Sequence, residues 1–180
     1  AGRFNSHQIA FAANPVLIED TLALRFSLDK NVTDGIIVSE DGANDRAAFS
    51  DVETWRLGLR FEPTEDLSAV IKLTHIDNDG SIPELSGEEL PRGVSAVENN
   101  RDHKISSINA DLSFDLADTM TLTSNTVYSS ADISRDSQSS VADLTQERTY
   151  DVFEQEFRLN LETDNAKAVL GVFYTDISED

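Results

Sequence analysis

The sequence contains no cysteine, so neither a disulfide framework nor a thiolate metal site is available to it. It also lacks any apolar run of about 18 residues, which excludes a transmembrane helix but not spanning strands, because these need only about 9–11 residues. Basic residues are scarce: 14 lysines and arginines stand against 34 acidic residues, for a formal net charge of −20. Nucleic acid is therefore not expected as a partner, because phosphate binding needs a basic footprint.

Apolar residues make up 39 % of the chain and alternate with polar ones, as in strands with one apolar face. In residues 55–73 the odd positions outside the turn carry tryptophan, leucine, phenylalanine, alanine and isoleucine. A proline and two acidic residues at 63–66 indicate a tight reversal. Pairing the two arms by their alternation predicts that Leu59 lies opposite Ala69, which makes one face of this hairpin apolar.

A second hairpin is predicted over residues 105–128, where the alternation resumes on both sides of a short turn. Its pattern predicts that Phe114 lies opposite Leu122 and Leu116 opposite Met120. Because a hairpin is not stable alone, both must belong to a larger sheet.

Further strands predicted at 3–32 and 153–177 raise the total to about eight, in four hairpins. The last of them, residues 166–177, is apolar on both faces, so the sequence does not orient it. Their short turns are centred near Leu17, Thr64, Asp118 and Asp164. The intervening connections, residues 33–50, 77–103 and 131–149, are long and polar. Short turns at one end and long loops at the other are typical of an outer-membrane β-barrel, whereas compact domains mostly have short connections. We therefore expect an all-β fold, an antiparallel up-and-down transmembrane β-barrel.

Aromatic residues are few, at 7 % of the chain, but their placement follows the strand ends. Those near the long connections are Trp55, Tyr128, Phe153 and Tyr174, and those near the short turns are Phe61 and Phe114. Two aromatic girdles of this kind are typical of the two membrane interfaces.

Four strand-turn-strand segments resemble those in the barrels of TonB-dependent outer-membrane receptors. They are NPVLIEDTLALRFSLDKNVTDG at 14–35, LRFEPTEDLSAVIKLTHIDNDG at 59–80, LADTMTLTSNTVYSS at 116–130, and EQEFRLNLETD at 154–164, which AVLGVFYTD follows. The resemblance covers nearly the whole chain, in the family's order. It implies that residues 1–180 form an internal fragment of a larger barrel domain, without the family's plug domain or TonB-contacting box.

The resemblance also implies a function. Family members are receptor-transporters in the outer membrane of Gram-negative bacteria, and they take up a ferric siderophore, a cobalamin or an oligosaccharide. The implied partners are outer-membrane lipid, a small nutrient ligand bound by the long loops, the plug domain and the TonB system. Neither enzymatic activity nor a cofactor is expected. Two alternatives stay open: a self-contained eight-stranded outer-membrane barrel, and a soluble acidic β-sheet module that binds at the cell surface.

The alternation divides the strands into two sets of side chains. One set is expected to form an outward belt in contact with lipid: Leu24, Phe26, Leu57, Leu59, Ile71, Leu112 and Leu122. The other is expected to line the lumen: Arg25, Arg56, Arg60, Lys72, Asp111, Asp115, Glu154, Glu156 and Arg158. Water or a plug would solvate these charges, whereas a dry barrel interior would not.

No catalytic, cofactor or metal site is expected. Glu154 and Glu156 could in principle act as paired glycosidase carboxylates, but a charged ladder lining a wet lumen is the better interpretation. Residues 77–80 begin like a calcium loop, but isoleucine and proline follow where oxygen ligands should be. The three histidines, His7, His75 and His103, do not have the spacing of metal ligands.

Overall fold

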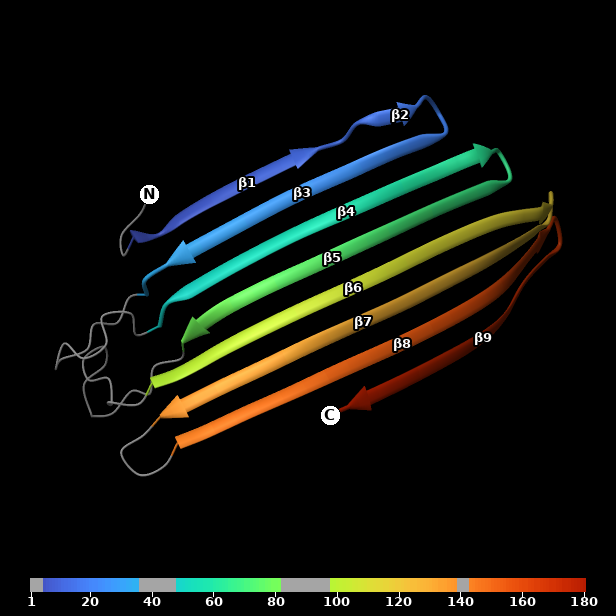
Figure 1. Cartoon of the computed structure of the whole chain (residues 1–180). Coiled ribbons are helices and arrows are strands. Elements are labelled where there is room, and N and C mark those ends of the chain that lie inside the picture. The colour runs from blue at the N-terminus through green and yellow to red at the C-terminus, as the bar shows by residue number, and fades with distance from the viewer. Residues whose placement is uncertain (1–4, 36–47, 82–97, 139–142) are drawn as a thin grey trace.

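The structure is a computed structural model, and it describes residues 5–35, 48–81, 98–138 and 143–180. Nearly all of them lie in strands (Figure 1). The strands are β1 (His7–Ala13), β2 (Val16–Ile18), β3 (Leu22–Thr33), β4 (Ser50–Thr64), β5 (Leu67–Ser81), β6 (Glu98–Ala117), β7 (Met120–Gln138), β8 (Asp143–Thr163) and β9 (Ala166–Glu179).

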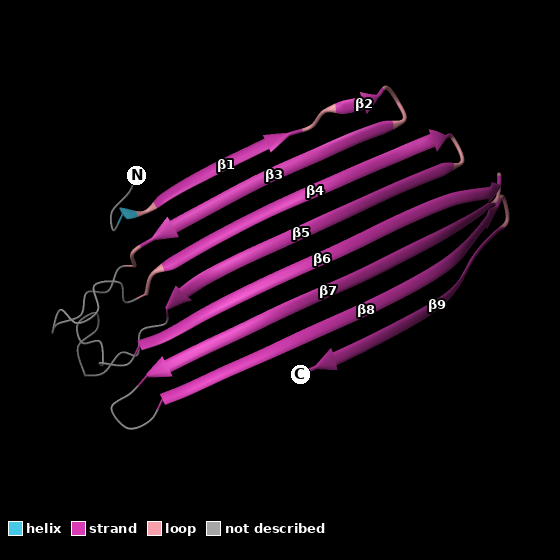
Figure 2. Ribbon diagram, in the orientation of Figure 1, coloured by secondary structure: helices cyan, strands magenta, loops and turns pink. Residues whose placement is uncertain are grey.

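All of these strands belong to one antiparallel sheet in which sequence neighbours lie side by side, in the order β1-β3-β4-β5-β6-β7-β8-β9 (Figure 2). The expected all-β, up-and-down, barrel-like fold is therefore confirmed. The described part of the chain contains no helix of the length and hydropathy needed to span a membrane.

The described residues form nine strands rather than about eight, because the first one is interrupted. Both β1 and β2 pair with β3, and Asn14 and Pro15 separate them. Proline has no amide hydrogen to donate to the ladder, so the pairing breaks at this point. The Pro15 carbonyl still accepts a bond of 3.0 Å from the Leu24 amide, so β1 and β2 follow one line along β3.

The predicted residue partners are wrong in the first hairpin, although the predicted faces are right. Leu59 lies opposite Ile71 instead of Ala69, and the register shifts between Phe61 and Thr64, around Pro63. Because the error is two residues, every side chain stays on its expected face.

In the second hairpin, Phe114 lies opposite Leu122, as predicted. Leu116 does not lie opposite Met120, because the register shifts between Asp115 and Ala117, and Ala117 takes that place. The two-residue turn that follows is tighter than the one expected from the sequence.

Two of the three long connections are shorter than predicted. Residues 77–81 and 98–103 continue β5 and β6, while 131–138 and 143–149 continue β7 and β8. These segments are polar on both faces, so they lack the alternation from which strands were recognised. Residues 36–47, 82–97 and 139–142 of the predicted loops lie outside the described residues.

The sheet is a single layer with one apolar face, which we call face A. All seven predicted belt residues lie on it, in register with one another across β3 to β7. No side chain among the described residues is fully buried, and the large apolar ones are open, with Leu112 at 45 % and Phe114 at 44 % exposure. The strands therefore have no core of their own, and face A needs cover from outside the sheet.

Face A contains a polar cluster on β7 and β8 that the sequence analysis did not identify. Gln155 donates to the Ser124 hydroxyl at 3.0 Å and accepts from the Thr126 hydroxyl at 2.6 Å. Its amide nitrogen also lies 3.1 Å from the carbonyl oxygens of Asn125 and Glu156. These side chains satisfy one another, which reduces the cost of placing them in an apolar surface.

The sheet is not closed into a barrel. Among the described residues β1 pairs only with β3 and β9 only with β8, so both outer strands leave one edge without a partner. The register also orients β9, which the sequence left undecided. Leu170 and Val172 lie on face A, opposite Leu159 and Phe157, whereas Phe173 lies on the other face, opposite Glu156.

Candidate functional site

The second face of the sheet, which we call face B, carries the charged side chains. The register places all nine predicted lumen-lining residues on this one face: Arg25, Arg56, Arg60, Lys72, Asp111, Asp115, Glu154, Glu156 and Arg158. They come from β3 to β8, and seven of them form two groups, one rich in cations and one mixed. That they line a lumen stays a prediction.

The cationic group surrounds Gly58 in β4. Arg25 and Lys72 lie directly opposite this glycine on the two neighbouring strands, and Arg56 and Arg60 lie two residues to either side. The absent side chain contributes to a hollow of about 470 Å³. Sequence alternation identified the four cations but not that one glycine lies at their centre.

Three of these cations have polar partners. Arg25 donates to Asn14 at 2.9 Å, Arg60 pairs with Glu62 at 2.6 Å, and Lys72 lies 3.5 Å from the Asp111 carboxylate. Arg56 makes no hydrogen bond or ion pair within the part of the chain that the structure describes. Since most of these side chains are exposed, the pairs contribute little to stability.

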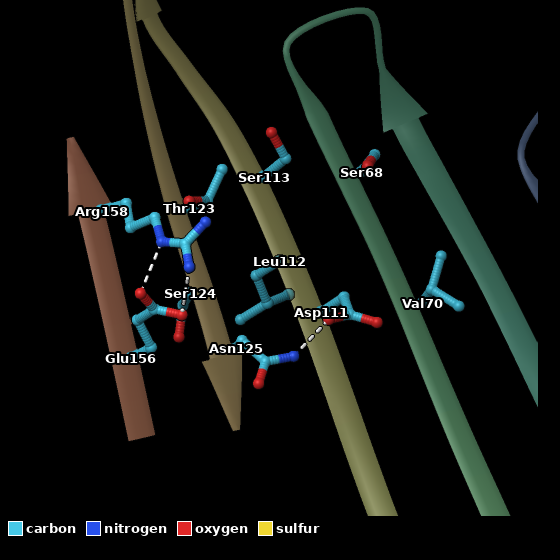
Figure 3. A pocket seen from close by; sticks show the side chains of 10 residues that line it. All are labelled: Ser68, Val70, Asp111, Leu112, Ser113, Thr123, Ser124, Asn125, Glu156 and Arg158. Atoms are coloured by element: carbon cyan, nitrogen blue, oxygen red, sulfur yellow. Dashed lines mark hydrogen bonds and ion pairs between the residues drawn. The ribbon is translucent and has the colours of Figure 1, made fainter. Parts of the chain in front are cut away.

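The mixed group lines a second hollow, of about 420 Å³, between β5 and β8 (Figure 3). Two nitrogens of Arg158 donate to the Glu156 carboxylate, Nε at 2.5 Å and Nη2 at 2.9 Å. Asp111 accepts a bond of 2.5 Å from the Asn125 amide, and the dashed lines in Figure 3 mark the contacts of these two pairs. Arg158 therefore pairs with a carboxylate two residues away on its own strand, whereas Asp111 of β6 is bonded to a neutral amide of β7.

The remaining predicted residues lie outside these clusters. Asp115 accepts from the Thr121 hydroxyl at 2.6 Å near the short turn. Glu154 has no hydrogen bond or ion pair with any described residue. Glu154 and Glu156 share a face, but the second carboxylate is engaged by Arg158. Within residues 5–35, 48–81, 98–138 and 143–180, no group of three potential metal ligands occurs.

Face B continues past the predicted residues into the strand extensions, and the sequence analysis missed what lies there. The side chains concerned are Asn99, Arg101, His103, Arg135, Gln146 and Arg148. They were assigned to connections because both faces of these segments are polar. In β6 and β8 the sequence signal is parity, because these side chains have the same odd or even numbering as the predicted charged residues farther along the strand. Arg135 has no such signal, because β7 carries no other charged residue of its parity.

Comparison with known proteins extends the description of the fold. No protein-family model matches the sequence, and no curated protein matches it either. Among solved structures, the chain is similar to the siderophore receptor PiuA from Acinetobacter baumannii, with a TM-score of 0.72 and 13 % identity. The match covers 100 % of this chain and 29 % of that receptor chain.

This similarity bears out the resemblance to receptor barrels at the level of fold. At so low an identity the match concerns backbone architecture, so it carries no information about particular side chains. The chain therefore has the fold of a stretch of a siderophore-receptor β-barrel.

Proposed function

We propose that this chain is part of the wall of an outer-membrane receptor-transporter. The observation that carries this proposal is the separation of the two faces: the apolar belt lies on face A, and the predicted charged residues lie on face B. An outer-membrane barrel wall needs this arrangement, because one side meets lipid and the other meets water.

Lipid is the cover that best fits face A. Its large side chains are exposed, and its cross-strand rows reach over the sheet, as from Phe26 through Leu57 to Leu73. On face B, in contrast, burial under a second protein layer would leave Arg56 and Glu154 as charges without partners, which is costly. A wet or plug-filled lumen solvates them, so face B is directed inward.

The alternatives fit less well. A self-contained small barrel needs hydrogen bonds between β1 and β9, and the described residues contain none. A soluble surface module needs protein to cover face A. Residues 1–180 are instead a partial barrel domain, completed by further strands and a plug, and located in the outer membrane of a Gram-negative bacterium.

In this proposal a small nutrient ligand enters at the end with the long connections, and a TonB-type system supplies the energy that moves the plug. By analogy with the similar receptor, a ferric siderophore is the first ligand to test, followed by a cobalamin and an oligosaccharide.

The test is uptake by bacteria with and without the intact protein. Cells supplied with radioactive iron bound to siderophores are expected to lose accumulation of one complex when the protein is deleted. Accumulation should also stop when a protonophore collapses the inner-membrane potential. The cobalamin and oligosaccharide are assayed in the same way. Unchanged uptake of all three ligand classes after deletion would contradict the transport proposal.

A further inference from the structure

The strand extensions at the long-connection end separate charge by face. On face A, beyond the apolar belt, the charged residues are Lys30, Asp51, Glu53, Asp77, Asp79, Asp102, Lys104, Asp132, Asp136, Asp143, Glu147, Asp151 and Asp176. On face B of β5 to β8 the extensions carry Arg101, His103, Arg135 and Arg148, and no carboxylate among the described residues. At this end of the sheet, face A is therefore mostly acidic, whereas face B of β5 to β8 is basic.

The centre of this basic surface is a pair of facing arginines. Arg101 of β6 lies directly opposite Arg135 of β7 in the register. Side chains in such positions have Cβ atoms about 4.5–5.5 Å apart, and like charges there destabilise the sheet. Gly80 lies opposite Arg101 on the other side, so β5 adds no side chain at that position.

Neither arginine is neutralised by a carboxylate among the described residues, although acidic residues outnumber basic ones by 34 to 14. The Nε of Arg101 is buried and has no hydrogen-bond acceptor among the residues that the structure describes. Arg135 donates from its Nε to the side-chain oxygen of Asn99 at 3.0 Å, and Asn99 is only 3 % exposed. A buried donor without an acceptor is rare and calls for an explanation.

Arg148 behaves differently from these two. It donates to the Tyr150 hydroxyl and to Glu179, both at 3.1 Å, so its charge has a partner. Among the arginines of the strand extensions, the contrast leaves Arg101 and Arg135 as those without an anionic partner among the described residues.

We propose that Arg101 and Arg135 bind an oxyanion, a carboxylate or phosphate group, at the long-connection end of face B. Guanidinium groups match the planar, two-oxygen geometry of such groups, and one anion between two arginines turns their repulsion into attraction. The Asn99 amide fixes the Arg135 side chain in place. This inference rests on the proposed function, because it takes the oxyanion to be part of the transported ligand. The transported ligand is then anionic.

The test uses the intact protein purified in detergent, with citrate and inorganic phosphate as probes and maltotriose as the neutral control. Titration calorimetry measures binding to the original protein and to Arg101→Gln and Arg135→Gln. Each substitution is expected to weaken citrate binding by about tenfold to a hundredfold, the usual effect of losing a charge-assisted hydrogen bond. Lys104→Gln is the matched control, since Lys104 lies on face A next to Asp102, at 3.5 Å. It should leave citrate binding unchanged.

Thermal unfolding of the same variants separates binding from a structural role. Because each arginine repels the other, Arg101→Gln is expected to unfold at the original temperature or above it. Arg135→Gln also leaves the buried side-chain oxygen of Asn99 without its donor, so it is expected to unfold at a somewhat lower temperature while staying folded at the temperature of the titration. Citrate affinity that does not change in both variants, or that falls equally in Lys104→Gln, would overturn the proposal. The proposal would also be overturned if both glutamine variants were partly unfolded at the temperature of the titration, because unfolding would then explain the loss of citrate binding.

Two further results identify the source of the oxyanion. If citrate competes with uptake of the nutrient, the bound group belongs to the ligand. If citrate binds without affecting uptake, the site holds a free anion. The proposed function is tested separately: it fails if deletion of the protein leaves nutrient uptake unchanged. That result does not depend on whether citrate binds.

Discussion

At the scale of single residues, the position of a side chain along its strand determines its environment. Leu59 and Arg60 are neighbours in β4, yet Leu59 lies on face A between Leu24 and Ile71, and Arg60 lies on face B. The two positions are consecutive in the same strand, so they lie at nearly the same distance from its ends and differ in the face on which the side chain lies. They therefore form a matched pair for testing which face meets lipid.

Leu59→Arg is expected to destabilise the intact protein by about 2–4 kcal/mol, because it places a charge in lipid near the middle of the apolar belt. Arg60→Ser removes only an exposed ion pair with Glu62 and should have a much smaller effect. Reversible unfolding by denaturant in lipid bilayers measures both. Equal sensitivity at the two positions would show that face A is not in contact with lipid.

At the scale of elements, the sequence predicted the strands where one face is apolar and missed them where both faces are polar. The hairpins at β4–β5 and β6–β7 were recognised, and their faces were right because alternation has a period of two. Exact partners depended on irregularities next to the turns, such as the one around Pro63, which alternation does not report.

The same limit explains the incomplete candidate site. Nine charged residues on face B were found because apolar residues alternate with them. Arg101 and Arg135 were missed because their neighbours Asp102 and Asp136 are polar too, so the segments resembled loops. Backbone pairing alone, with nineteen residue pairs between β7 and β8, reveals the strands there.

Amide hydrogen exchange tests these extensions directly. If residues 131–138 and 143–149 are paired strands, their amides are expected to exchange slowly, because both segments have hydrogen-bonded neighbours. A solvent-exposed loop would exchange rapidly. Mass spectrometry of peptides from the intact protein measures the rates, with peptides from the apolar part of β7 as the slow reference. Rapid exchange in both segments would contradict strand extensions of this length.

At the scale of the whole molecule, the described strands form a single open sheet whose stability depends on what packs against its two faces and two edges. It has no fully buried side chain among the described residues, and β1 and β9 each have an unpaired edge. Backbone groups at such edges cost several kcal/mol each in lipid if they stay unpaired. Further strands at both edges, lipid on face A and water or a plug on face B satisfy these requirements together.

The central claim is that face A meets lipid and face B meets water. Because residues 1–180 contain no cysteine, single cysteines can be introduced one at a time from position 55 to position 61 of β4 in the intact protein, with any cysteine outside these residues replaced first. In outer-membrane vesicles, a water-soluble maleimide is expected to label cysteines at 56, 58 and 60 readily and those at 57, 59 and 61 poorly. A membrane-soluble probe should give the opposite pattern. Labelling without a two-residue period, or with the reverse phase, would contradict the account.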